Sequence, residues 1–213
     1  YFRDYDSLKP ELKDRVKTMT ETRENRMHQL IERVNGVIPE RFQGTIEFEN
    51  VKRAAEGVLA RPHLAREMVR LGIVSSTGQA FERYLVKYNV ERDNLDVQTA
   101  ISLVRESKGV PVMAHPGERS YSLICPEKGR HPENAPVLLE ELKEMGLLGL
   151  ECHYPYHERM GTVPYFINLA ESFKLIVTGS RDFHGFNSHQ HVKIFGTTKM
   201  EPDFLEQFQS IWN

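Results

Sequence analysis

Residues 110–117, Val110-Pro111-Val112-Met113-Ala114-His115-Pro116-Gly117, decide the fold. A short apolar run of this kind is typical of a buried parallel strand, and the histidine, proline and glycine follow where such a strand would end. Upstream, Asp96 can cap a helix over 97–107, and Gly109 follows the end of that helix. The stretch therefore predicts a helix, a strand and then a polar turn.

The same order of elements recurs twice downstream. A helix predicted over 136–145 leads to a strand over 148–152, and a helix over 163–173 leads to a strand over 174–178. Helices and strands that alternate at this spacing indicate an α/β fold with a parallel sheet. Because three strands are too few for a barrel or an open sheet, we expect strands upstream of Tyr1 in the native gene product, or a partner chain, to complete the sheet.

The first 94 residues have a different character. Apolar residues recur there at helical spacing and predict helices over 8–34, 48–59, 62–72 and 76–85, without a convincing strand. A last helix is predicted over 203–212. The sequence therefore predicts a mainly helical part, residues 1–94, and an α/β part, residues 95–213.

Composition excludes several classes of protein. The chain has 213 residues, a formal net charge of -2 and two cysteines, which are too few for a disulfide framework. Without a basic stripe, a dedicated nucleic-acid-binding surface is not expected, although a few arginines can still hold a small anionic substrate. No apolar stretch approaches the roughly 20 residues of a membrane helix. We expect a cytoplasmic protein that does not enter a membrane; its oligomeric state is not predicted.

Polar residues lie at or after the end of each predicted strand in the α/β part. Because the carboxyl ends of parallel strands meet at one edge, we expect these side chains to gather there. Imidazole and carboxylate ligands suit zinc, manganese or iron, and a bound metal supplies hydroxide near neutral pH. The residues are His115, Glu151, His153, His157, Asp182 and His184.

Four of these residues, and the neighbouring Arg181, also have a simpler interpretation. A histidine before proline, such as His115, is compatible with a hydrogen-bonded turn, and Asp182 is compatible with a turn cap. His153 and His157 fit solvated loop residues, which is the interpretation we favour for His153. Arg181, beside Asp182, fits a surface ion pair.

Several motifs together resemble one family. Met113–Gly117, Gly149–Glu151 and Thr178–Gly185 are similar to the later motifs of the polymerase and histidinol phosphatase (PHP) superfamily. Ala60–Ala65 and Ala80–Leu85 narrow the resemblance to stand-alone phosphoesterases of that superfamily that carry a small helical insert. The resemblance covers the chain from about Arg23 to Gly185.

The resemblance implies a fold and a metal cluster. The fold would be part of a distorted (β/α)7 barrel. Residues 1–94 would be mainly a helical insert, although the first few of them would end a barrel strand. Residues 95–213 would be the carboxy-terminal part of the barrel. The cluster would hold two or three divalent metals, manganese, iron or zinc. By motif match His115, Asp182 and His184 would be catalytic metal ligands.

The resemblance also implies a reaction and its substrate contacts. The reaction would be hydrolysis of a phosphate ester, of a nucleotide or of short RNA, by a metal-bound hydroxide. Arg61 and His63 would face the substrate phosphate, where a guanidinium gives a two-pronged hold. Arg119, Glu151 and His157 would be further substrate contacts.

The chain departs from the family pattern at its start. Members begin with a His-x-His motif, an Asp, a Thr-Asp-His segment and a Glu, and none of these is present. The alternative hypothesis is therefore a non-catalytic, degenerate module that binds nucleotide or a protein partner. A third hypothesis, an amidohydrolase, lacks the strand-end lysine that often bridges metals in those enzymes. The segment 120–132 is interpreted either as a substrate-selecting lid or as a plain surface loop.

Overall fold

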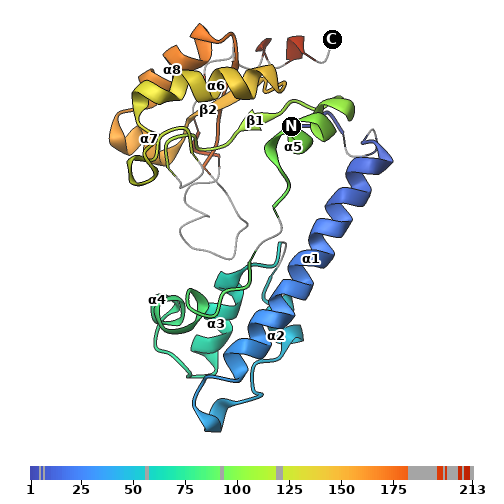
Figure 1. Ribbon diagram of the computed structural model, residues 1–213, viewed down its shortest axis with the longest axis vertical. Helices are drawn as coiled ribbons and strands as arrows, with labels where there is room; N and C mark the ends of the chain where they lie inside the picture. Colours follow the sequence, from blue (N-terminus) through green and yellow to red (C-terminus); the bar gives the residue numbers. More distant parts are fainter. Residues whose placement is uncertain are drawn as a thin grey trace. The chain divides into compact units, whose positions relative to one another are not determined.

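The computed structural model describes residues 1–4, 6, 8–55, 58–91, 94–118, 122–181, 196–198, 200, 206–207 and 209–211. The chain divides into two compact units (Figure 1). One, the α/β unit, comprises Tyr1–Leu12 and Leu95–Asn213; the other, the helical unit, is Lys13–Asn94. Each unit buries its own cluster of hydrophobic side chains.

The α/β unit contains a parallel sheet in the order β1-β2-β3. Its strands are β1 (Val112–Met113), β2 (Gly149–His153) and β3 (Ile176–Gly179). The predicted α/β class with parallel strands is confirmed. The first strand is shorter than predicted. Pro111 has no N–H to give to a ladder, and Val110 instead exchanges two backbone hydrogen bonds of 2.8 Å with Tyr1.

Four helices accompany the described strands: α5 (Val97–Glu106), α6 (Ala135–Glu144), α7 (Pro155–Met160) and α8 (Val163–Ser172). The predicted cap of α5 is confirmed, because the Asp96 carboxylate accepts a hydrogen bond of 2.8 Å from the Thr99 N–H. The helix α7 was not predicted. It starts at Pro155, which suits a first helical position, and ends before Gly161, which has a left-handed φ of +68°.

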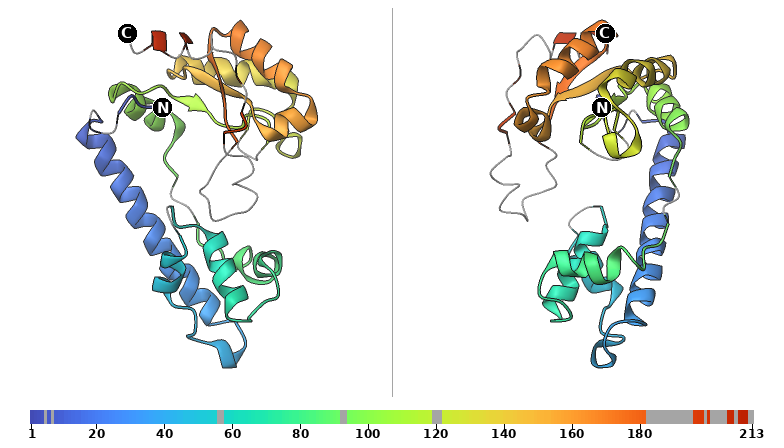
Figure 2. Two further views of the ribbon diagram at one scale, coloured as in Figure 1. Left: turned by 180° about the vertical axis from the view of Figure 1, so that it is seen from behind. Right: turned by 60° about the vertical axis from the view of Figure 1, so that its left-hand side comes forward.

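The two faces of β2 have different surroundings. Leu150 and Cys152 point into the core, where side chains from α6 and α8 join them; Figure 2 shows these helices beside the strands from two further directions. Because side chains alternate along a strand, Glu151 points to the opposite face, where Thr178 of β3 is its neighbour in register. A buried carboxylate thus lies on the face away from the apolar core.

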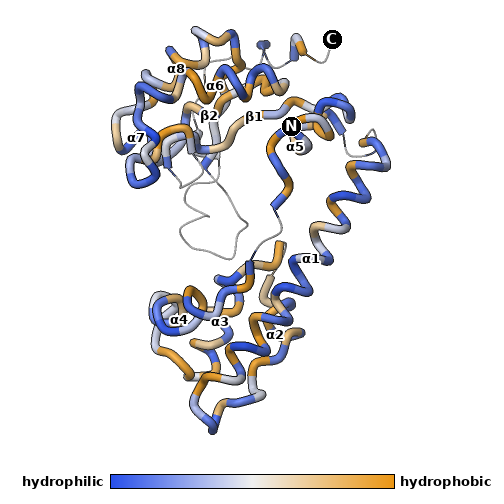
Figure 3. The backbone as a smooth tube through the Cα atoms, viewed as in Figure 1, coloured by the Kyte–Doolittle hydropathy of each residue, from blue (hydrophilic) through white to orange (hydrophobic). Residues whose placement is uncertain are grey.

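The helical unit is built from α1 (Pro10–Asn35) after its first three residues, α2 (Phe48–Arg53), α3 (Arg61–Arg70), α4 (Thr77–Ala80) and a π-helical turn, Phe81–Leu85. Two predictions need correction: α2 ends at Arg53 rather than near 59, and the helix predicted over 76–85 is a short α-helix followed by the π-turn. Hydrophobic positions recur along α1 among hydrophilic ones (Figure 3). Those at helical spacing in its second half, Met27, Leu30, Ile31 and Val34, are buried in the core of the unit.

Half of the helix predicted over 203–212 lies outside the described residues, and in the described half residues 206–207 and 209–210 are helical. Among the described residues, no helix is both long and apolar enough to cross a membrane.

Candidate functional site

The turn after β1 holds His115 in an unusual backbone conformation. His115 has a φ of +34°, although it is not glycine and precedes a proline. Such a conformation costs about 1–3 kcal/mol and persists only where the surroundings impose it. Two side chains hold the residue at its backbone. Glu151 Oε2 accepts from the His115 N–H at 2.7 Å, and Ser122 Oγ donates to the His115 carbonyl at 3.1 Å.

The His115 ring itself is left available. Its Nδ1 atom is buried and has no hydrogen-bond partner among the described residues. The ring centroid lies 5.5 Å from that of Tyr154. A buried imidazole nitrogen without a partner is costly unless something binds it, and a divalent metal is a suitable group. On this observation His115 fits a metal ligand.

The described residues do not complete a metal site by themselves. Within the part of the chain that the structure describes, no group of three or more His, Cys, Asp or Glu side chains is placed to hold a metal. Asp182 and His184, the other predicted ligands, lie outside the described residues, as does Arg119. Their convergence on His115 therefore stays a prediction.

Glu151 is the central residue of β2 and lies beside the backbone of His115. Its side chain is 6% exposed, and one of its oxygens holds the His115 backbone. The carboxylate also influences Tyr1. Burial raises the pKa of the Tyr1 hydroxyl, a hydrogen bond with Thr178 opposes that rise, and the charge of Glu151 adds to it. The geometry shows Glu151 as a support of the turn; its contact with substrate stays a prediction.

His157, on α7, has both ring nitrogens engaged. Nε2 accepts from the Gly117 N–H at 3.1 Å, and Nδ1 lies 3.0 Å from the Cys152 carbonyl oxygen. Because Nε2 accepts, the ring proton is on Nδ1 and is donated to Cys152. The ring is fully buried and stacks on Phe166 at 4.3 Å between centroids, and burial lowers the pKa of His157. This geometry presents neither nitrogen to a ligand and does not favour the predicted substrate contact.

Gly117 is required by this close packing. A Cβ at this position would lie 2.8 Å from Phe166 Cζ and 2.9 Å from His157 Nε2, which is closer than real side-chain carbons come. Both neighbours are rings of buried residues, so they have little freedom to move aside. The His-Pro-Gly sequence therefore combines a histidine whose Nδ1 has no partner among the described residues with a glycine that the packing requires.

The end of β3 is fastened to β2 and α7. The Ser180 N–H donates to the His153 carbonyl at 3.0 Å, and Arg181 forms an ion pair with Glu158. Arg181 Nη2 also donates to the Thr197 carbonyl at 3.2 Å. His153 is half-buried in β2, so its interpretation as a solvated loop residue was wrong. These contacts fix the chain directly before Asp182.

Arg61 and His63 lie at the start of α3 in the helical unit. The Arg61 guanidinium lies over the Phe81 ring, 5.5 Å from its centroid, and donates to the Leu85 carbonyl at 3.4 Å. His63 Nδ1 accepts from the Ala60 N–H at 3.0 Å and so caps the helix. Burial, and then the charge of Arg66, lower the pKa of His63. Their approach to a phosphate stays a prediction.

Sequence reasoning missed Ser122. It falls in the segment 120–132, where no motif singles it out; only the fold returns it to the His115 carbonyl. The described part of this segment forms a tight turn: the backbones of Cys125 and Arg130 bond to each other, and the Tyr165 hydroxyl donates to the Pro132 carbonyl at 2.9 Å. Its role as a lid stays a prediction.

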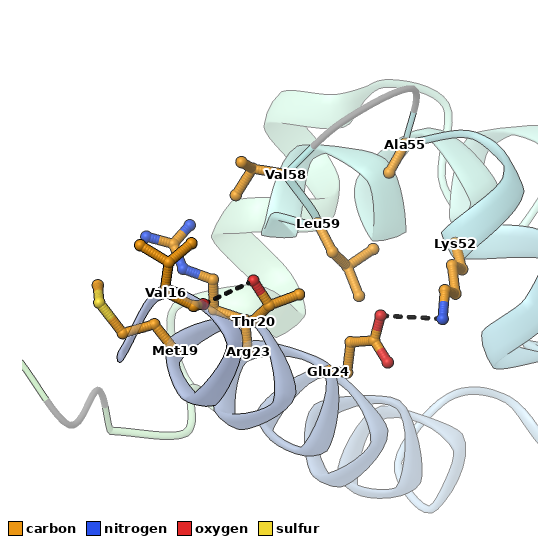
Figure 4. Close-up of a pocket in the computed structure, with 9 residues that line it drawn as sticks. All are labelled: Val16, Met19, Thr20, Arg23, Glu24, Lys52, Ala55, Val58 and Leu59. Atoms are coloured by element: carbon orange, nitrogen blue, oxygen red, sulfur yellow. Dashed lines mark hydrogen bonds and ion pairs between the residues drawn. The ribbon is translucent and has the colours of Figure 1, made fainter. Parts of the chain in front are cut away.

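A separate pocket of about 320 Å³ lies within the helical unit (Figure 4). Glu24 and Lys52 form an ion pair of 2.9 Å along its wall. The rest of the lining is mostly apolar and includes neither a histidine nor a cysteine, so we do not regard it as a catalytic site. The lining residues are Val16, Met19, Thr20, Arg23, Glu24, Lys52, Ala55, Val58 and Leu59.

No protein-family model matches this chain. A 5'-3' exoribonuclease of Haemophilus influenzae is 38% identical over 72 residues, 32% of this chain and 26% of that protein. A phosphoribosyl 1,2-cyclic phosphate 1,2-diphosphodiesterase of Eggerthella lenta is 33% identical over 102 residues, 47% of this chain and 33% of that protein. The chain thus spans about a quarter to a third of the length of these curated relatives.

Two solved structures resemble this chain over most of its length. One, from Bifidobacterium adolescentis, is described as a metal-dependent phosphoesterase; its TM-score is 0.66 at 22% identity, covering 92% of this chain and 64% of that one. The other is an amidohydrolase from Chromobacterium violaceum with bound sulfate and no metal; its TM-score is 0.68 at 20% identity, covering 95% and 68%. At such identities the likeness shows the fold alone.

The sequence matches and the fold agree with the strand-end motifs. The exoribonuclease and the cyclic phosphate diphosphodiesterase are enzymes that act on phosphate esters, in agreement with the resemblance that the strand-end motifs carry. His115 follows β1 and Glu151 lies within β2, the two strands that carry the first two of these motifs. Over the parts that match, this chain is similar in sequence to a 5'-3' exoribonuclease and to a cyclic phosphate diphosphodiesterase, and its fold is similar to that of a metal-dependent phosphoesterase.

Proposed function

We propose that the protein hydrolyses phosphate esters with the help of bound divalent metals, and that its substrates are nucleotides or short oligonucleotides. The observation that carries the proposal is the buried, unpartnered Nδ1 of His115 at the carboxyl edge of a parallel sheet. The names of the relatives support the substrate class, since one acts on RNA and another on a cyclic phosphate.

In this proposal His115, Asp182 and His184 hold the metals, which are manganese, iron or zinc, two or three in number. The metals would activate water near neutral pH and neutralise charge on the phosphate. Glu151 and Ser122 support the reaction indirectly, because they hold His115 at its backbone and leave the ring nitrogen for the metal.

The phosphate would be held by Arg61, with His63 and Arg119 as further contacts. A guanidinium offers paired donors to phosphate oxygens and keeps its charge at all relevant pH values. The Phe81 ring and the Leu85 carbonyl already restrict the Arg61 side chain, so less freedom is lost when it binds.

The test compares the full-length protein with its His115→Ala variant, using nucleoside monophosphates and short 5'-phosphorylated RNA as substrates. We expect activity that requires divalent metal, disappears in chelator and falls at least 100-fold in the variant, together with loss of bound metal. His28→Ala is the matched control, because this exposed histidine stacks on Phe48 in the helical unit.

The opposite result would favour the alternative hypothesis. A full-length protein that binds nucleotide but no metal, and turns over neither substrate, would be a non-catalytic module. Equal turnover with and without chelator would contradict the metal-dependent reaction itself. The amidohydrolase hypothesis gains nothing from its structural neighbour, because a likeness at 20% identity concerns the fold.

A further inference from the structure

We infer that His157 is a positioning residue: it clamps the turn that carries His115, instead of contacting substrate. The inference rests on the proposed function, in which His115 is a metal ligand. It concerns how the protein keeps that ligand in place, and three side chains from different segments take part in it: His157, Glu151 and Ser122.

The His157 ring joins two parts of the α/β unit that are distant in sequence. Its Nδ1–H is donated to the Cys152 carbonyl, which belongs to β2, and its Nε2 accepts from the Gly117 N–H, which belongs to the turn after β1. One ring therefore ties the turn to the neighbouring strand. Only the neutral form with the proton on Nδ1 can make both bonds.

Packing fixes the ring in the place where it makes these bonds. His157 is fully buried, with Phe166 stacked on it at 4.3 Å and Tyr154 edge-on at 5.5 Å between centroids. Gly117 allows the approach, because any side-chain carbon there would overlap the ring. A residue enclosed in this way is poorly placed to meet a substrate and well placed to hold backbone.

The three supports act on the backbone of the turn and leave the His115 ring alone. The Glu151 carboxylate accepts a hydrogen bond from the His115 N–H, and the Ser122 hydroxyl donates one to the His115 carbonyl. The His157 ring accepts one from the Gly117 N–H, two residues later. Together they impose the left-handed conformation of His115. The ring is thereby oriented before any metal arrives, which is the usual effect of residues that support metal ligands.

The test uses two variants that keep different halves of the clamp. In His157→Gln the longer side chain places an oxygen near the position of Nε2, so it can still accept from Gly117. In His157→Asn the shorter side chain can still donate to Cys152 but cannot reach Gly117. Leu169→Ala, in the same core cluster, controls for loss of stability alone.

Metal affinity is measured by calorimetric titration with Mn²⁺, and the Gly117 amide is followed by hydrogen exchange in the metal-free protein. We expect the Asn variant to bind metal about 10–100-fold more weakly and to lose protection at Gly117. The Gln variant and Leu169→Ala should stay within a few-fold of the wild type in both measurements.

Failure of the clamp and failure of the proposed function give different results. If the wild type binds metal and the Asn variant matches it in affinity and in Gly117 protection, the clamp is overturned. If the wild type binds no metal, the proposed function fails, while Gly117 protection still decides the clamp. Should the Asn variant not fold, nitrogen NMR of the wild-type ring decides, since a His157 protonated on Nε2 would exclude the Gly117 bond.

Discussion

The turn after β1 and the start of α3 both present histidines from family motifs, yet they use them differently. At the turn, side chains hold the backbone and the His115 ring keeps a buried nitrogen without a partner. At α3, the His63 ring itself caps the helix through Ala60. A histidine is therefore not a candidate metal ligand by residue type alone. What matters is whether its ring nitrogens already make hydrogen bonds within the protein.

The largest effect should come from Gly117→Ala, which crowds the turn. The added carbon would lie within 3 Å of two buried rings, and overpacking of this kind costs about 1–3 kcal/mol. Urea unfolding measures the loss. Gly78→Ala is the control at α4, where the nearest atom is Ser76 Oγ at 3.8 Å and a neutral or slightly stabilising result is expected. Equal stability in both variants would contradict the close packing.

Glu151→Ala should follow, because it removes the acceptor of the partly buried His115 N–H. An unsatisfied group of this kind costs about 1–3 kcal/mol. In Glu151→Gln the amide oxygen can still accept from His115, so we expect a smaller loss of stability, seen as a melting temperature nearer to the wild type. A Gln variant as unstable as the Ala variant would show that the charge, and not the hydrogen bond, supports the turn.

At α3 the matching change is His63→Ala, which removes a helix cap. Loss of a cap costs about 0.5–2 kcal/mol, and we expect the lower part of this range because the rest of α3 is held by core residues such as Leu64 and Met68. Unfolding measurements give the stability, and Mn²⁺ titration should show unchanged metal affinity. A loss of bound metal would make His63 a ligand and end the contrast with His115.

The smallest expected effect concerns Cys152, on the core face of β2. Burial raises the pKa of its thiol to about 12, with the charge of Glu151 adding to the shift. The thiol should therefore stay protonated and unreactive toward iodoacetamide at pH 8 in the folded protein. Mass spectrometry would detect modification at Cys152 only after denaturation; rapid labelling of the native protein would contradict the burial of this face.

The helices and strands that could be predicted are those whose signals lie within their own stretch of sequence. The strands β2 and β3 and the helices α5, α6 and α8 follow from apolar runs, helical spacing and a capping aspartate. The helix α7 was missed because its polar sequence resembles a loop between two elements. The π-turn at Phe81–Leu85 was read as a continuous helix, since apolar spacing does not distinguish these two backbone geometries.

The position of His115 after a strand could be predicted, but the hydrogen bonds that hold its turn could not. His115 follows the end of β1, as predicted, whereas Glu151, predicted at the end of its strand, is the central residue of β2. Their bond joins residues 36 positions apart and runs from backbone to side chain, and no spacing in the sequence encodes it. Nor does any local pattern show that both ring nitrogens of His157 form hydrogen bonds with backbone atoms.

The backbone of His115 has one further consequence. A glycine tolerates a φ of +34° without steric cost, so His115→Gly should relieve the turn while removing the imidazole. The folded protein would then become more stable, while it would lose the imidazole that the proposed function assigns as a metal ligand. Free imidazole could occupy the space left by the ring, so we expect it to restore part of the activity of the variant. In the proposed function, the histidine at 115 thus lowers stability and supports reactivity.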